Sequence, residues 1–305
     1  MAMDTALKLG TRGSPLALAQ ANMVRDALIA AHGVAVEIVV VVTTGDRVQD
    51  RPLAEIGGKA LWTKELDAAL LDGRIDLAVH SMKDVETRLA DGIVVAAMLP
   101  RADVRDRLIG AGSIADLPQR ARIGTSSPRR AAQLRSLRPD VEILPLRGNV
   151  ATRLAKLDAG DLDATLLAAA GLDRLNIAAG TAIPLETLLP APSQGAVGIT
   201  ARQGDTTTLA LLAAIDHAAT STAVGLERRF LACLGADCHS SVAALAEIDG
   251  DQVQFRAEIL LPDGSERRGS AFIVAAADAT SEVPHLAARL LNAASPALRA
   301  LFDPG

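Results

Sequence analysis

The chain has 305 residues, of which 50% are hydrophobic and 2% aromatic, and its formal net charge at pH 7 is −5. This length is enough for two or three domains with a sizeable aliphatic core. Nucleic-acid binders usually combine a basic excess with aromatic platforms on which bases stack, and this composition has neither. We therefore expect no nucleic-acid partner.

The N-terminal sequence predicts no export signal, because it lacks a basic stretch followed by an apolar one. A membrane-spanning helix would need roughly 18 or more consecutive apolar residues, and no such run is present. Cys233 and Cys238 are too few and too close for a disulfide framework. We expect a reduced, cytoplasmic protein without a membrane partner.

The first third of the chain alternates strand-like and helix-like patterns. Ser14 and Pro15 suit the start of a helix, as N-cap and first-turn residue. The β-branched run 34–42 predicts a buried strand, and 43–58 predicts a loop of a length that is usually functional or disordered. In chain order, we expect strands at 6–10, 34–42, 77–79 and 93–99 and helices at 15–32 and 59–71.

The sequence at 122–130 repeats the pattern of the first strand and helix. Both segments read as a strand, then Gly-Thr, then Ser-Pro at the start of a helix, with the Ser at Ser14 and Ser127. Each places hydroxyl and amide groups at a helix N-terminus, which favours anions. We therefore expect two similar α/β lobes that face each other across a cleft, with further strands at 141–144 and 163–168.

The pattern changes from about residue 218 onward. A helix to Leu234, with Glu227 on its solvent side, precedes three strand-like segments and a final helix at 281–294. Strands followed by a helix indicate a separate α+β domain. The predicted fold class is thus α/β, with two lobes and a smaller C-terminal α+β domain. The predicted boundaries are lobe 1 at 1–98, completed by 195–215, lobe 2 at 99–194 and the C-terminal domain at 216–305.

Cationic side chains recur just after predicted strands or at predicted helix starts. The guanidinium group is a planar fork that pairs with a carboxylate or a phosphate, so the pattern predicts a substrate with many anionic groups. Neither nucleotide-binding loop fingerprint occurs, and the histidines lack paired ligand spacing, so we expect no metal. These cations are Arg12, Lys59, Lys83, Arg129, Arg130, Arg147, Arg153 and Arg174.

The segment 76–84 passes from a buried apolar run to Lys83 and Asp84. Ligands of open α/β sheets bind at the carboxyl ends of strands, so both are candidates for acting on a substrate.

Two other classes of protein would account for part of this sequence. A two-lobe anion-binding protein without catalysis would need only the arginines. A pyridoxal-phosphate enzyme could form its Schiff base on Lys59 or Lys83. Neither alternative explains both the long loop and Cys238, which lies in a loop between a helix and a sheet.

Six motifs, in this order, resemble those of the hydroxymethylbilane synthases, also called porphobilinogen deaminases. They are GTRGSPLA at 10–17, GGK at 57–59, HSMKD at 80–84, GTSSPRR at 124–130, LRGNV at 146–150 and QGAVGI at 194–199. The resemblance implies two lobes like those of periplasmic binding proteins and a third domain that carries a covalent dipyrromethane cofactor. By position, the thioether to that cofactor would form on Cys238.

The resemblance also implies a function. The family joins four porphobilinogen molecules head to tail, releases ammonia each time, and yields hydroxymethylbilane for tetrapyrrole (haem) biosynthesis. We expect a monomeric transferase whose small-molecule substrate is porphobilinogen. Each pyrrole carries an acetate and a propionate, so a full chain on its cofactor presents roughly twelve carboxylates to forked donors.

Roles for single residues follow from the matched positions. Asp84 matches the catalytic aspartate. The cofactor-binding positions, besides Cys238, are Ser81, Lys83, Asp84, Thr125, Ser127, Arg129, Arg130, Arg147 and Arg153. The substrate-binding positions are Arg12, Ser14, Gln20, Lys59, Arg147, Arg153 and Arg174. The chain departs from the family pattern at Glu55, Glu86 and Asp237, where relatives usually have a basic residue, a proline and a glycine.

Overall fold

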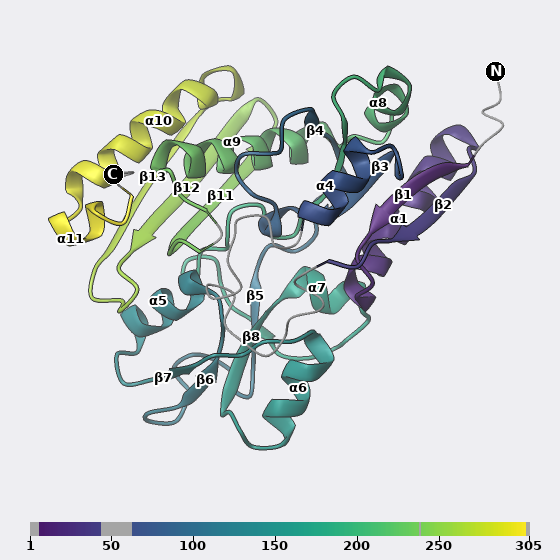
Figure 1. Cartoon of the computed structure of the whole chain (residues 1–305). Coiled ribbons are helices and arrows are strands. Elements are labelled where there is room, and N and C mark those ends of the chain that lie inside the picture. The colour runs from purple at the N-terminus through teal and green to yellow at the C-terminus, as the bar shows by residue number, and fades with distance from the viewer. Residues whose placement is uncertain (1–5, 44–62, 238, 303–305) are drawn as a thin grey trace. The chain divides into compact units, whose positions relative to one another are not determined.

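The computed structural model describes residues 6–43, 63–237 and 239–302 (Figure 1). The chain forms two compact units, 1–102 with 195–221 and 103–194 with 222–305. The second unit contains two separate sheets. The finer division into three domains, with the boundaries given above, stays a prediction.

The first unit is built on a five-stranded sheet in the order β2-β1-β3-β10-β4. The first three strands are parallel, and β10 runs antiparallel to both of its neighbours. Helices α1 and α8 pack on one face, and α4 packs on the other. The bounds are β1 (Leu7–Thr11), α1 (Pro15–His32), β2 (Val36–Val40), α4 (Lys64–Leu71), β3 (Leu77–Ser81), the 3-10 helix η1 (Met82–Asp84), β4 (Ile93–Met98), β10 (Val197–Arg202) and α8 (Thr206–Ala213).

The second unit contains a sheet of the same design, in the order β7-β6-β8-β5-β9. Its first three strands are also parallel, and the fourth, β5, is antiparallel to both neighbours. The predicted pair of similar α/β lobes is therefore confirmed. The bounds are β5 (Asp106–Ile109), β6 (Arg122–Gly124), α5 (Pro128–Leu137), β7 (Glu142–Leu144), α6 (Val150–Asp158), β8 (Ala164–Ala168), α7 (Ala169–Arg174) and β9 (Thr181–Ala182).

The repeated Gly-Thr sequence has a packing reason in both sheets. A Cβ atom on Gly10 would collide with Ile75, and one on Gly124 would lie 2.5 Å from Leu162 Cδ1. A glycine near the carboxyl end of each strand therefore lets these side chains pack directly against the backbone, and a larger residue would have to displace them. The threonines that follow, Thr11 and Thr125, are both buried.

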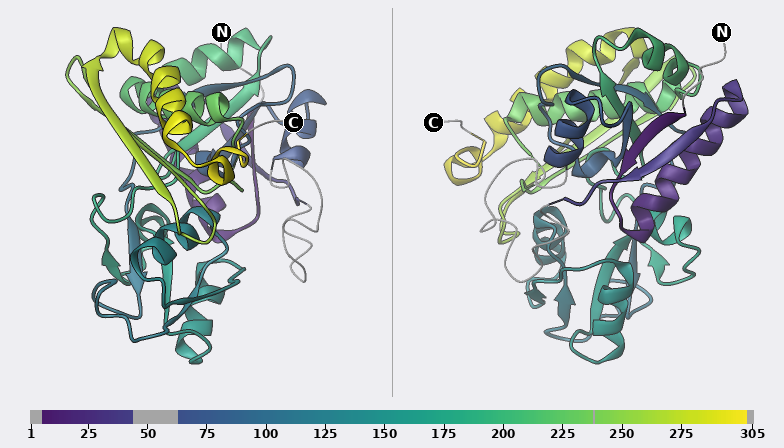
Figure 2. Two further views of the ribbon diagram at one scale, coloured as in Figure 1. Left: turned by 90° about the vertical axis from the view of Figure 1, so that its left-hand side faces the viewer. Right: turned by 45° about the vertical axis from the view of Figure 1, so that its right-hand side comes forward.

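The third sheet, β11-β12-β13, is antiparallel, and helices α9 and α10 pack on it around Phe230, Phe255 and Leu286 (Figures 1 and 2). The predicted α+β character of this region is confirmed. Helix α10 begins at Ala276, earlier than the predicted residue 281. The bounds are α9 (Ala218–Leu234), β11 (Val242–Asp249), β12 (Gln252–Leu260), β13 (Arg267–Ala275), α10 (Ala276–Ala293) and α11 (Pro296–Arg299).

Two sequence predictions about burial are wrong. Strand β2 is an edge strand, so the apolar run that predicted a buried strand leaves Val40 50% exposed. Glu227 is fully buried rather than on the solvent side of its helix. Its carboxylate accepts hydrogen bonds from the backbone N–H groups of Ser193 (2.5 Å) and Ala246 (2.8 Å), which compensate for its burial.

Among the described residues, no single helix is long and apolar enough to cross a membrane, although α8 and α9 together, bent by 112°, meet the length and composition criteria. Within the same ranges, no group of three or more His, Cys, Asp or Glu side chains could hold a metal ion.

Candidate active site

The predicted site residues of the first unit lie at one edge of its sheet. Strands β1 and β3 are adjacent and parallel, with Leu9 beside Leu77, so their carboxyl ends lie together. Arg12 and Ser14 follow β1, and Lys83 and Asp84 follow β3. This edge is where ligands of open α/β sheets bind.

Ser14 and Gln20 fix the geometry of this edge. The Ser14 hydroxyl caps α1 by accepting from the backbone N–H of Ala17 at 3.3 Å. Gln20, one turn further along and buried, donates from Nε2 to the Ser81 hydroxyl at 2.8 Å. The structure therefore brings Gln20, predicted to lie near the substrate, together with Ser81, predicted to lie near the cofactor.

Asp84 is exposed, while the residues on its flanks are anchored. Met82 and Val85 are buried, and the Val85 N–H donates to the Met82 carbonyl at 3.2 Å. A Cβ atom on Gly198 would collide with Met82, so β10 is shaped to receive this side chain. Among the described residues, the Asp84 carboxylate has no hydrogen-bond or ion-pair partner. The result is a carboxylate on a rigid support that faces solvent.

The predicted site residues of the second unit follow three adjacent parallel strands, β7, β6 and β8. Ser127 caps α5, and the Thr125 hydroxyl accepts from the Ser127 N–H at 3.1 Å. Arg147, after β7, is partly buried, and its Nη1 has no hydrogen-bond partner among the described residues. Such an atom fits a bound anion, because a buried unpaired donor is costly.

Arg153 and Arg174 are positioned by helix termini. Arg153, on α6, donates from Nε to the Gly148 carbonyl at 2.9 Å. Gly148 has φ +105°, a conformation that favours glycine. Arg174 ends α7 and is largely buried, and this burial lowers its pKa, while the Asp173 carboxylate acts in the opposite direction.

The guanidinium groups of Arg129 and Arg130 are not exposed at the surface. Both side chains are buried, and both bind Asp106, at 2.8 Å from Arg129 Nη2 and 2.7 Å from Arg130 Nη2. Burial alone would raise the pKa of Asp106, but the two guanidinium groups hold that pKa well below its ordinary value. Sequence reasoning missed Asp106, and no motif pointed to it.

Two predicted residues, Lys59 and Cys238, lie outside the described residues. Cys233, the other cysteine, is exposed on α9. The remaining predicted residues divide between the two units. Within the second unit, the buried unpaired donors of Arg129, Arg130 and Arg147 fit a group with several carboxylates.

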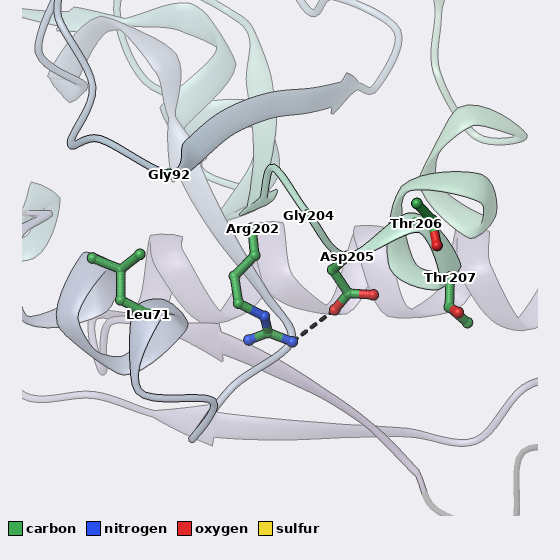
Figure 3. A pocket seen from close by; sticks show the side chains of 7 residues that line it. All are labelled: Leu71, Gly92, Arg202, Gly204, Asp205, Thr206 and Thr207. Carbon is green, nitrogen blue, oxygen red and sulfur yellow. Dashed lines mark hydrogen bonds and ion pairs between the residues drawn. The ribbon is translucent and has the colours of Figure 1, made fainter.

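A hollow of about 590 Å³ in the first unit is lined by none of the predicted site residues (Figure 3). Its one guanidinium, that of Arg202, donates to Asp205 at 2.7 Å and to the carbonyl oxygens of Leu70 and Ile75. Arg202 therefore joins β10 to its neighbours and offers no open charge to a ligand.

Comparison with known families assigns nearly the whole chain. A family model described as "Porphobilinogen deaminase, dipyromethane cofactor binding domain" matches residues 7–210, and one described as "Porphobilinogen deaminase, C-terminal domain" matches residues 221–292. The chain belongs to the porphobilinogen deaminase family. This membership confirms the resemblance seen in the six sequence motifs.

Curated relatives agree with this membership. A porphobilinogen deaminase from Sphingopyxis alaskensis is 57% identical over 309 residues, covering 98% of this chain and 97% of the relative. One from Paracoccus denitrificans is 50% identical over 292 residues, covering 93% of each. A solved nutrient binding protein from Burkholderia cenocepacia bound to methionine is 17% identical with a TM-score of 0.41, covering 67% of this chain and 90% of that one.

Proposed function

We propose that Asp84 is the catalytic carboxylate of this chain and that Cys238 carries its cofactor. The chain is a porphobilinogen deaminase: it joins four porphobilinogen molecules head to tail, with release of ammonia, on a dipyrromethane primer. The alternative of an anion-binding protein without catalysis is not favoured, since the family matches span both the cofactor-binding and the C-terminal domains. The observation that supports Asp84 is its exposed position on anchored flanks at the carboxyl end of β3.

Asp84 can act on charge that develops during the reaction. Loss of ammonia from the aminomethyl group of porphobilinogen leaves an electron-poor, cationic carbon. A fixed carboxylate stabilises this charge, accepts hydrogen bonds from pyrrole N–H groups, and handles the proton of the leaving amine. When bound, the dipyrromethane supplies the electron-rich pyrrole carbon that is extended.

The other predicted residues would hold carboxylates. Arg147 supports this role most directly, because its buried Nη1 has no partner among the described residues. The start of α5, capped by Ser127, lies next to the Arg147 segment, because the Ser126 hydroxyl donates to the Leu146 carbonyl at 2.9 Å. The proposed cofactor-binding set is Ser81, Lys83, Asp84, Thr125, Ser127, Arg129, Arg130, Arg147 and Arg153, and the proposed substrate-binding set is Arg12, Ser14, Gln20, Lys59, Arg147, Arg153 and Arg174. A monomer in the cytoplasm, without nucleic-acid or membrane partners, stays a prediction.

The assignment of Cys238 is tested with the two cysteines as matched variants. Cys238→Ala should give protein of bare polypeptide mass that forms no hydroxymethylbilane. Cys233→Ala should keep both the mass increment of the cofactor and the activity. Intact-mass spectrometry and a product assay read these outcomes, and an adduct that persists on Cys238→Ala would place the attachment elsewhere.

A further inference from the structure

Asp106 is the centre of a buried polar cluster in the second unit. Its Oδ2 accepts from Arg129 at 2.8 Å, and its Oδ1 accepts from Arg130 at 2.7 Å and from Gln194 Nε2 at 2.9 Å. The Asp106 side chain is completely buried. Both of its oxygens are thus occupied, so Asp106 itself cannot contact a substrate.

The cluster connects four parts of the second unit. Arg129 also donates to Gln133 at 2.9 Å, and Gln133 in turn donates to Glu258 of β12 at 3.2 Å. Gln194 donates to the Val104 carbonyl at 2.7 Å, ahead of β5. The start of β5, helix α5, the segment that ends at Gln194 and the third sheet therefore share one hydrogen-bonded network.

The charges of this cluster do not balance. Arg129 and Arg130 share the single carboxylate of Asp106. Glu258, at the far end of the network, is already paired with Arg267. Three guanidinium groups thus meet two carboxylates, which leaves one positive charge in excess. The Nε atoms of Arg129 and Arg130 are buried and have no hydrogen-bond partner among the described residues. Burying an uncompensated charge and two unpaired donors is costly, so this arrangement suits a site that receives an anion.

The first unit shows that a lobe of this design does not need such a cluster. The two sheets have the same topology, and both helices begin with a capping Ser followed by Pro. The residues after that Pro are Leu16 and Ala17 in one lobe but Arg129 and Arg130 in the other. The fourth strand begins with buried Val197 in one lobe and with Asp106 in the other. Apolar residues thus serve the fold, and the charged set is specific to the second unit.

We infer that Asp106 is a positioning residue for cofactor binding. It fixes the orientation of the Arg129 and Arg130 guanidinium groups and neutralises one of their two charges. The pair then presents one net positive charge and two Nε–H groups to one carboxylate of the dipyrromethane. This inference rests on the proposed function, in which Arg129 and Arg130 bind the cofactor.

The test measures the fraction of folded protein that carries the cofactor, by intact-mass spectrometry of variants purified from cells. Asp106→Asn removes the charge and keeps the size. Loss of hydrogen bonds to charged groups should reduce the loaded fraction by about tenfold. Leu108→Ala, in the core two residues further along β5, is the control for lost stability alone, since Leu108 is buried and outside the cluster. Asp163→Asn controls for the loss of a more exposed Asp–Arg pair at the start of β8.

Wild-type protein, Leu108→Ala and Asp163→Asn should all load fully, even where the melting temperature falls. If Asp106→Asn loads as well as a Leu108→Ala protein of similar melting temperature, Asp106 is only structural and the inference is wrong. If Asp106→Asn does not fold, Gln194→Met gives the test, because it keeps the charges but removes one donor to Asp106. Full loading of Gln194→Met then overturns the inference. Absence of any adduct on the wild-type chain would instead overturn the proposed cofactor attachment.

Discussion

Replacement of Asp84 by Asn removes the proposed catalytic charge and preserves the shape of the side chain. The backbone around it should be unchanged, because Met82 and Val85 anchor the turn from the buried side. Folding and cofactor loading should therefore survive in Asp84→Asn, and the defect should be confined to chemistry.

The expected size of the defect follows from the environment of Asp84. Two unit charges about 4 Å apart interact by about 1 kcal/mol in bulk water and by about 4 kcal/mol at an effective dielectric constant of about 20. Asp84 is exposed, and a bound substrate would cover part of it, so the energy lies between these limits. A value of about 3 kcal/mol corresponds to a step that is slower by a factor of roughly 10².

The assay is the single-turnover release of ammonia from porphobilinogen by enzyme whose intact mass shows a loaded cofactor. Asp91→Asn is the matched control, because Asp91 is an exposed carboxylate of the same unit outside the proposed site. The control should turn over at the wild-type rate. An Asp84→Asn rate within about threefold of wild type, equivalent to less than about 0.7 kcal/mol, would show that the catalytic carboxylate is another residue.

Three further changes test separate parts of the structure. Arg147→Lys keeps the positive charge but loses the planar guanidinium group, so cofactor loading or substrate affinity should fall by about tenfold or more. The control is Arg135→Lys, on the outer part of α5, which should change neither quantity. Intact-mass measurements report cofactor loading, and steady-state kinetics report substrate affinity. Glu227→Ala leaves two buried backbone N–H groups unpaired and should lower the free energy of unfolding in urea by about 2 to 4 kcal/mol, whereas the exposed neighbour variant Arg229→Ala should have little effect. Hydrogen bonds from the side chain and backbone of Ser295, together with Arg268, lower the pKa of Glu266 to about 2. Its ionised form therefore stabilises the fold above the ordinary glutamate pKa of 4.5, and this contribution is lost as the pH falls toward 2. The melting temperature of Glu266→Gln should fall less steeply with decreasing pH across that interval than the melting temperature of wild type. Parallel plots of melting temperature against pH would contradict the role of this carboxylate.

Local chemistry made much of the fold predictable from the sequence. Ser14 and Ser127 cap helices that begin at the next residue, as the Ser-Pro pattern predicted. Gly250 and Gly264, each preceded by an aspartate, occupy left-handed turn positions between the strands of the third sheet, and the Asp-Gly pair is typical of such hairpin turns. These helix caps and turns depend on a few neighbouring residues, so the local sequence is enough to predict them.

Burial could not be predicted in the same way, because it depends on distant partners. The run that includes Val40 reads as a buried strand, but its place at the end of the sheet order leaves one side open. Glu227 reads as a solvent-facing charge, and its partners Ser193 and Ala246 lie 34 and 19 residues away in the sequence. Only the assembled fold shows that these backbone groups need an acceptor.

Asp84 and Asp106 show how topology gives the same side chain two roles. Asp84 follows the carboxyl end of a parallel strand and remains in solvent. Asp106 begins a strand that runs antiparallel to β8, with Asp106 beside Ala168 at the carboxyl end of β8. The reversed direction of β5 brings its first residue to the edge where α5 starts, within reach of Arg129 and Arg130. A carboxylate there is buried and paired, and acts through the arginines it holds. The sequence around Asp106 does not reveal this, because the direction and neighbours of β5 are set by strands more than fifty residues further along the chain.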